Sequence, residues 1–302
     1  MNDRATKLLR ERSQMVFRAL PKALAGEEEP LHQMRVAGRR LRVALPIVSQ
    51  KPQGQRVRRA ARLLRDLTRV AGTSRDLDVS AALFDARVKE MGPVSSTLRS
   101  LRKRLRLARN KSRAQMAEAL LDLDIAELRR QLRAIEARKG ESLFAVLHRL
   151  RQERERQGEE LLRALDAVGD RYDPEALHGV RIESRKLRYL LELGDDLKGV
   201  TSAGPRLLKE IQGQLGQIHD DHVLAQWFAT QAARAADRGE GDLEMEAARQ
   251  EALSLEQCRR HHQEFLAANP TARIREALNL VDRGALLAPH FEPFLGTPSA
   301  ER

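Results

Sequence analysis

The chain has 302 residues, with 55 lysines and arginines against 43 aspartates and glutamates, which gives a formal net charge of +12. Hydrophobic residues make up 41% of the chain, enough for a sizeable core. The single cysteine, Cys258, excludes an intramolecular disulfide and a cysteine-cluster zinc site. No apolar run has the length of a membrane span, and residues 1–20 lack the apolar centre of a signal peptide, so we expect a cytoplasmic protein.

The predicted elements are helices throughout. Leucine, alanine and valine recur every three or four residues, and almost nothing alternates with a period of two, so we expect an all-α protein with helices of about 15–25 residues. Asp173 and Pro174 form a typical helix start, and the proline-containing run 285–302 predicts an irregular tail. In chain order, the predicted breaks are Gly26–Pro30, Lys51–Gln55, Gly72–Ser74, Gly92–Pro93, Gly169–Pro174, Gly194–Pro205, Gly239–Gly241 and Asn269–Thr271.

The chain contains an internal repeat. Segments His32–Arg42 and His178–Arg188 both follow the pattern His-x-x-Arg-[Val/Ile]-x-x-x-Arg-[Arg/Lys]-Leu-Arg, at an offset of 146 residues. A second pair of segments, Arg62–Val79 and Arg206–Val223, matches at an offset of 144. We therefore expect two homologous antiparallel helical bundles, related by a pseudo-two-fold axis.

The repeat sets the expected domain boundaries. Residues 1–140 form the first bundle and residues 141–288 the second, and residues 289–302 form the irregular C-terminal tail. The two bundles together would make one domain, with the division near Arg138–Glu141.

Basic residues are placed in stripes along four predicted helices. At about 100° per residue, the basic positions of each repeat motif share one sector, while Met34, Leu41 and Leu187 lie on a core-facing side. Like charges at helical-neighbour spacing repel each other, so the stripes suggest a bound anion. A stripe about 15 Å long suits an extended polyanion better than a single nucleotide. The stripes are His32, Arg35, Arg39 and Arg42; His178, Arg181, Arg185 and Arg188; Arg58, Arg62, Arg65 and Arg69; and Arg99, Arg102, Arg106, Arg109 and Arg113.

The ordinary alternative is a solvated face that pairs with the many acidic residues. It is the better interpretation of any single stripe. Four stripes, two of them in a duplicated motif with the same histidine, favour a binding surface. The positive charge suits nucleic acid, anionic lipid or a phosphate polymer, and arginine suits phosphate oxygens. With 3% aromatic residues, the chain has too few stacking platforms for single-stranded nucleic acid.

The histidines and carboxylates near the stripes give weaker indications of a catalytic or metal-binding role than the arginines give of anion binding. His32 and His178 occupy matching positions but have only arginines on their stripes, so we expect binding rather than catalysis. Asp76 and Asp220, with Asp78 and Asp221, follow Gly72 and Gly216 and are expected to lie in first helical turns as caps. They would otherwise orient stripe arginines or, with the neighbouring histidines His219 and His222, hold a metal. We expect no metal site and no cofactor.

The paired motif resembles the CHAD family, the conserved histidine α-helical domains, over roughly residues 5–285. Arg75–Val79 follows the family's turn closely, although Val70–Gly72 replaces its usual Leu-Gly pair. The second copy keeps Leu215 and Gly216 but has His219 where arginine or asparagine is common.

The resemblance implies two helical bundles around a basic central cleft or pore that binds inorganic polyphosphate without catalysis. The Glu-x-Glu-x-Lys signature of a triphosphate tunnel partner domain is absent, so a stand-alone binding module is expected, which the family links to polyphosphate or storage granules. The residues carried over are His32, Arg35, Arg39, Arg42, His178, Arg181, Arg185 and Arg188, joined by Arg65 and Lys209; stripe geometry adds Arg62, Arg69, Arg102, Arg106 and Arg109.

Two other functions stay open. A nucleic-acid-binding or nucleoid-associated protein fits the charge, but no known DNA-binding module is evident. A metal-dependent polyphosphate hydrolase would need the carboxylates around Asp76 and Asp220 to converge on the basic cleft.

Overall fold

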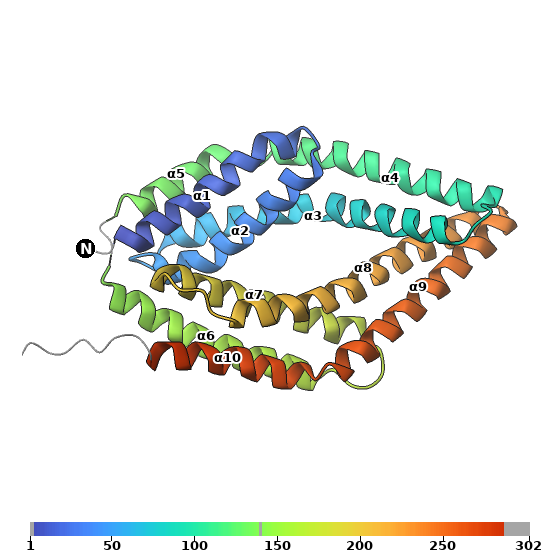
Figure 1. Ribbon diagram of the computed structural model, residues 1–302. Coiled ribbons are helices and arrows are strands. Elements are labelled where there is room, and N and C mark those ends of the chain that lie inside the picture. The colour runs from blue at the N-terminus through green and yellow to red at the C-terminus, as the bar shows by residue number, and fades with distance from the viewer. Residues whose placement is uncertain (1–2, 139–140, 287–302) are drawn as a thin grey trace, which may run out of the picture.

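The structure, a computed structural model, describes residues 3–138 and 141–286, and every regular element in these ranges is a helix (Figure 1). The all-α prediction is therefore confirmed for the described residues. The predicted tail at 289–302 lies outside them. The ten helices are α1 (Asp3–Leu24), α2 (Glu28–Val48), α3 (Gln55–Glu90), α4 (Ser96–Leu121), α5 (Ile125–Glu136), α6 (Leu143–Asp166), α7 (Pro174–Lys198), α8 (Gly204–Ala236), α9 (Gly241–Ala267) and α10 (Pro270–Leu286).

Most helix boundaries lie at the predicted breaks. The side chain of Asp173 caps α7 by accepting hydrogen bonds from the backbone N–H groups of Glu175 and Ala176. Gly199 ends the same helix with a φ of 71°, in the left-handed region that favours glycine. The predicted break from Gly194 therefore begins five residues later, at Gly199.

The predicted break at Gly72–Ser74 is wrong. Helix α3 continues through it for 36 residues, and α8 is 33 residues long, so both exceed the predicted length. A glycine inside a helix costs about 1 kcal/mol relative to alanine, which tertiary packing readily offsets. The expected capping role of the four aspartates is wrong for the same reason. They lie inside continuous helices, far from a first turn: Asp76 and Asp78 in α3, Asp220 and Asp221 in α8.

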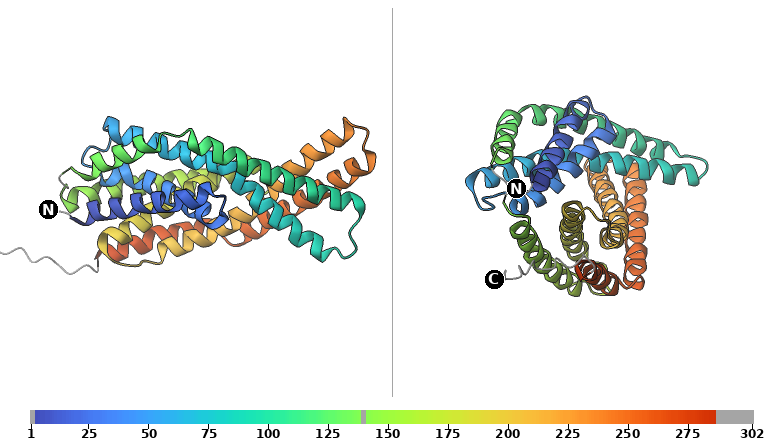
Figure 2. Two further views of the ribbon diagram at one scale, coloured as in Figure 1. Left: turned by 90° about the horizontal axis from the view of Figure 1, so that it is seen from above. Right: turned by 60° about the vertical axis from the view of Figure 1, so that its left-hand side comes forward.

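The helices pack as two sets of five. In the first set, α1 packs on α2, α2 on α3, α3 on α4 and α5, and α1 on α5. In the second, α6 packs on α7, α7 on α8, α8 on α9 and α10, and α6 on α10. The sets lie side by side along the length of the molecule, with α3–α4 and α8–α9 extending to the same end (Figures 1 and 2).

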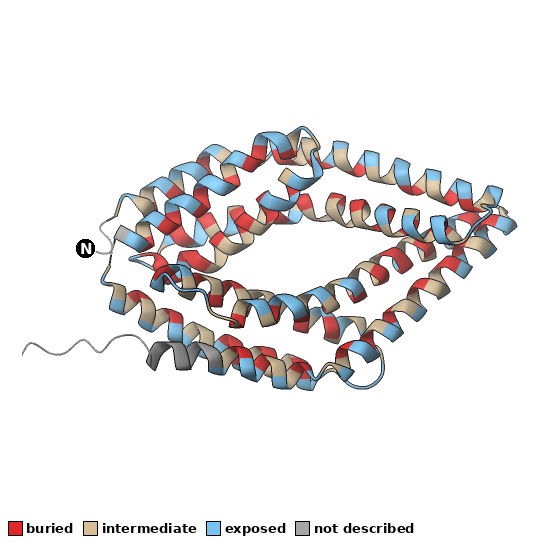
Figure 3. Ribbon diagram, in the orientation of Figure 1, coloured by how far each residue is buried: buried red, intermediate tan, exposed pale blue. Residues whose placement is uncertain are grey.

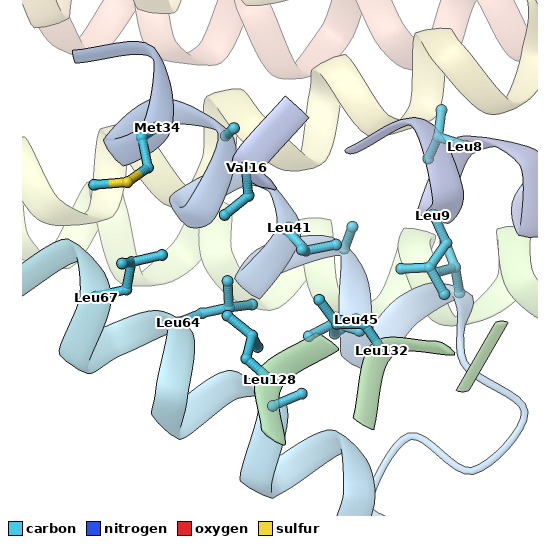
Figure 4. Close-up of a cluster of buried hydrophobic side chains, with 14 of the residues drawn as sticks. Leu8, Leu9, Val16, Met34, Leu41, Leu45, Leu64, Leu67, Leu128 and Leu132 are labelled. Atoms are coloured by element: carbon cyan, nitrogen blue, oxygen red, sulfur yellow. The ribbon is translucent and has the colours of Figure 1, made fainter. Parts of the chain in front are cut away.

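The core crosses between the two sets. A large cluster of buried side chains joins α1 to α5, with Leu41 and Leu64 among its members (Figure 4). The same cluster includes residues of α6 and α7, such as Leu193. At the far end, Phe84 of α3 and Phe228 of α8 meet edge to face, with ring centroids 4.9 Å apart. Buried positions line the inner side of most helices and exposed ones the outer side (Figure 3). Within residues 3–138 and 141–286, every helix is too polar or too short to serve as a membrane span.

Candidate anion-binding site

Helix α2 has its basic stripe on a different side from its core residues. Met34, Leu41 and Leu45 are fully buried, as the stripe geometry predicts. Gly38 allows close approach to α3, because a Cβ there would lie 2.9 Å from the methyl carbon of Thr68. This packing fixes the rotation of α2 about its axis. Its basic stripe is then turned toward the second set of helices, where α2 packs on α7.

Helix α7 repeats the arrangement. Val180, Leu187 and Leu191 are buried in the core of the second set. Gly216 of α8 lies beside the Arg181 guanidinium, whose Nη1 is 3.7 Å from the position that a Cβ would take, an ordinary van der Waals distance. Both repeat motifs therefore have the predicted core side and the predicted basic side.

Arginines of the two motifs converge between α2 and α7. Burial, followed by the charge of Arg39, lowers the pKa of Arg35 to about 10. Burial, followed by the charges of Arg39 and Arg181, lowers the pKa of Arg185 to about 9. Burial also lowers the pKa of Arg181, with Arg39 contributing. Four guanidinium groups from helices distant in sequence therefore lie close enough to repel one another.

These four arginines have few partners within the protein. Arg35 is only 8% exposed; its Nη1 donates to the carbonyl of Gly72 at 3.3 Å, and its buried Nε has no partner. Arg39, Arg181 and Arg185 make no ion pair with any carboxylate of the described part of the chain. A cluster of partly buried charges without ion-pair partners is costly, so an external anion would stabilise it.

Two carboxylates lie beside the cluster. The negative charge of Asp76 opposes the lowering of the pKa of Arg35, and the charges of Asp220 and Asp76 oppose it for Arg181. Neither carboxylate forms an ion pair with these arginines. Burial raises the pKa of Asp220 to about 6, and the negative charge of Asp76 contributes, while Arg181 opposes the shift. Of the three predicted roles for these aspartates, orientation of stripe arginines fits their position.

The histidines lie at one end of each stripe. Partial burial lowers the pKa of His32, and the charge of Arg75 lowers it further. Partial burial and the charge of Arg181 lower the pKa of His178, whose ring centroid is 5.7 Å from that of His219. Burial lowers the pKa of His219 to about 3. All three imidazoles are therefore held in the neutral form, which can donate a hydrogen bond to an anion.

Arg42 and Arg65 extend the cluster along the first set of helices. Burial and then the charge of Arg65 lower the pKa of Arg42. The counterpart of Arg42 in the second motif differs, because Arg188 donates to Glu192 at 2.7 Å and to Gln212 at 2.8 Å. The remaining predicted positions on α3 and α8 are exposed: Arg62, Arg69, which pairs with Asp66, and Lys209.

The predicted residues on α4 have partners within the protein. Arg102 and Arg106 both pair with Asp85 of α3. Arg109 pairs with Asp78 at 3.0 Å and with Glu28 of α2 at 2.8 Å. These contacts fasten α4 to α2 and α3, so Arg102, Arg106 and Arg109 already have carboxylate partners.

Several neighbours of the cluster were not predicted as site residues. Arg75 and His219 occupy matching positions at the 144-residue offset and lie beside His32 and His178, respectively. Tyr189 is buried, with the Arg188 guanidinium carbon 4.8 Å from its ring centroid. The second repeat segment pointed to the first two residues, whereas nothing in the sequence pattern pointed to Tyr189.

Metal-binding geometry is not evident around the cluster. Across the described residues, histidine, cysteine and carboxylate side chains form no group of three or more positioned to hold a metal ion. His222, one of the candidates, has its Nδ1 3.0 Å from the Tyr172 hydroxyl.

Two solved structures are similar to this chain. The crystal structure of the CHAD domain from the plant Ricinus communis has a TM-score of 0.60 and 23% identity, covering 87% of this chain and 91% of that one. PptA from Streptomyces chartreusis has a TM-score of 0.63 and 15% identity, covering 87% and 99%. Among curated protein sequences, none matches the chain. The CHAD domain family matches residues 7–229, which include both motifs, and the chain therefore belongs to the CHAD domain family.

Proposed function

We propose that this protein binds inorganic polyphosphate without catalysis, between helices α2 and α7. The observation that carries the proposal is the convergence of Arg35, Arg39, Arg181 and Arg185, of which the last three have no ion pair among the described residues. Arginine binds phosphate oxygens through paired N–H donors, and each phosphate would relieve the repulsion between two guanidinium groups.

The proposal includes a pseudo-two-fold arrangement around a central basic cleft. Each packing contact within α1–α5 has a counterpart within α6–α10. Three helices of the first set also pack on their counterparts in the second: α2 on α7, α3 on α8 and α4 on α9. An axis through the α2–α7 contact would place the two repeat motifs face to face. The site would then present the same basic stripe twice to one ligand.

A long, repeating anion suits such a site. Each stripe is about 15 Å long, and the two together present cations at regular intervals along the helices. A polymer with one negative charge per phosphate can contact several arginines at once, whereas a single phosphate can contact only two or three. The association of the family with polyphosphate supports this choice, and location at polyphosphate granules would follow from it.

The site residues divide into three groups in this proposal. The cluster itself consists of the four central arginines with His32, His178, Arg42 and Arg65 at its ends. Exposed basic residues on α3 and α8 would guide the polymer toward it. The α4 arginines would hold that helix in place. The exposed residues are Arg62, Arg69 and Lys209, and the α4 residues are Arg102, Arg106 and Arg109. Arg188 of α7 stands apart, because Glu192 and Gln212 hold its guanidinium group.

The test is a titration of the protein with long-chain polyphosphate and with duplex DNA at physiological salt. We expect tight binding to polyphosphate and at least about tenfold weaker binding to the duplex, since a cleft between helices admits a thin chain and excludes a wide one. Equal affinity for both polymers would mean nonspecific surface charge and would overturn the proposal. Release of phosphate on addition of Mg²⁺ or Mn²⁺ would indicate a hydrolase instead.

A further inference from the structure

A second basic site lies on the outside of the first set of helices. A cavity of ≈ 340 Å³ opens between α1 and α5, away from the α2–α7 cluster. Four arginines line it: Arg10, Arg18, Arg129 and Arg133. Its volume is within the range typical of small-molecule sites.

The cavity has an uncompensated positive charge. Glu136 is its single acidic lining residue, so four guanidinium groups face one carboxylate. The Arg18 guanidinium donates to the neutral amide of Gln14 at 3.3 Å. None of the four arginines makes an ion pair within residues 3–138 and 141–286. A ligand with three or four negative charges would balance this set.

The walls also have an apolar part. Phe17 and the buried Leu132 line the cavity, and the Arg129 guanidinium carbon lies 4.6 Å from the centroid of the Phe17 ring. This stacking holds one of the lining arginines in place. A site lined by both arginines and an aromatic ring suits an anion that carries a flat apolar group.

We propose that this cavity binds a nucleoside di- or triphosphate. The arginines would hold the phosphates, the Phe17 and Leu132 side would contact the base, and the Glu136 carboxylate would accept hydrogen bonds from ribose hydroxyls. An inorganic phosphate chain would satisfy only the arginines and would leave the other two features unused.

The cavity is not a general consequence of the fold. In the second set of helices, α6 and α10 also pack together, but Gly158 lies so close to α10 that a Cβ would be 3.1 Å from the methyl carbons of Leu278. The gap between α1 and α5 therefore belongs to the first set, and of its four arginines only Arg129 packs on an aromatic ring within the described residues.

The experiment is calorimetric titration with ATP, adenosine and tripolyphosphate, without magnesium. The test variant is Arg129→Ala/Arg133→Ala. The matched control is Arg130→Ala/Arg163→Ala, which removes the same charge from exposed arginines that pair with Glu127 and Glu159 outside the cavity. We expect the test variant to lose at least about tenfold in ATP affinity and the control to change by less than about twofold. Circular dichroism melts verify that both variants are folded.

Two further measurements distinguish ligand binding at this cavity from binding at the α2–α7 cluster. Arg35→Glu/Arg181→Glu, in which the central cluster is disabled, should retain ATP binding, and in this variant ATP should bind more tightly than either adenosine or tripolyphosphate. Loss of ATP binding in that variant, with retention in Arg129→Ala/Arg133→Ala, would overturn the inference. Equal affinity for ATP and tripolyphosphate would overturn the nucleoside assignment. Neither result depends on whether the central cluster binds polyphosphate.

Discussion

The arginines between α2 and α7 and the arginines along α4 look alike in the sequence and differ in the structure. Both sets follow helical spacing on one face. On α4, Arg102, Arg106 and Arg109 meet carboxylates from α2 and α3. Between α2 and α7, Arg39 and Arg185 face other arginines. Spacing therefore identifies a basic face, but only the partners contributed by neighbouring helices show whether that face is still available to a ligand.

The difference also separates stability from binding. Ion pairs of the α4 kind fasten one helix to another, and their net contribution is modest because they are partly exposed. Unpaired arginines brought together by packing reduce stability until an anion binds. A protein that retains such a cluster has a surface organised before its ligand arrives, which lowers the cost of binding.

The largest expected effect contrasts the two regions directly. Arg39→Ala/Arg185→Ala should weaken polyphosphate binding by about 100-fold, since each lost arginine–phosphate contact is worth about 1.5 kcal/mol. Arg102→Ala/Arg106→Ala removes the same charge and should weaken it by less than about threefold. Fluorescence titration with labelled polyphosphate measures the affinity of both variants. Similar losses in the two variants would mean that only total charge matters.

Ligand binding should raise the free energy of unfolding by an amount that grows with the logarithm of the affinity. At a polyphosphate concentration 100 times Kd, the free energy of unfolding should rise by about 2.7 kcal/mol. Part of this gain comes from relief of arginine repulsion, so Arg39→Ala/Arg185→Ala should show a much smaller rise. Differential scanning fluorimetry with and without polymer gives the comparison. An equal rise in the variant would place the ligand elsewhere.

Loss of an α4 anchor should affect stability rather than binding. The buried Asp78 carboxylate accepts a hydrogen bond from the Arg113 guanidinium at 2.7 Å and forms an ion pair with Arg109. Asp78→Asn should lower the free energy of unfolding by about 2 kcal/mol, less than for a fully buried pair because both arginines are partly exposed. Urea denaturation measures this change. Polyphosphate affinity of the folded variant should stay within about twofold, and a larger change would give α4 a direct role.

The smallest expected effect is a pH dependence. The pKa of Asp220 is raised to about 6, so this carboxyl gains a proton as the pH falls from about 7 to about 5. Because the folded-state pKa exceeds the unfolded one, this group contributes stability at low pH that is lost as the pH rises through about 6. Protonation also removes a negative charge beside Arg181. Polyphosphate binding should therefore tighten about threefold on acidification.

The control for this prediction is Asp220→Asn. It should bind more tightly at neutral pH, and its affinity should change less between the two pH values. His219, whose pKa is lowered to about 3, stays neutral across the same window. An unchanged pH profile in the variant would assign the titration to another group.

The sequence was sufficient to predict the helical class, the repeat and the two faces of the motif helices. Met34 and Leu187 are buried in the core, and Arg35 and Arg181 lie on another side of their helices, because helical periodicity determines the face of each residue. The sequence predicted a break at Gly72 because glycine is a weak helix former. In the structure, packing keeps α3 continuous through this residue. Periodicity gives no information about which helix faces which.

The remaining features depend on contacts between distant segments. The pairing of Arg106 with Asp85, the meeting of Arg35 with Arg181 and the cavity beside Phe17 each join helices whose proximity no local pattern encodes. The duplicated motif came nearest to predicting such a contact, because two copies of one motif are expected to lie opposite each other if a symmetry axis relates them.

The most direct test of the central claim is polyphosphate titration of Arg35→Glu/Arg181→Glu beside Arg238→Glu/Arg275→Glu, a control with the same charge change at two exposed arginines. Binding should disappear in the first variant and stay within about threefold in the second, with both variants folded by circular dichroism. If the first variant binds polyphosphate as the unmodified protein does, the cluster between α2 and α7 is not the binding site.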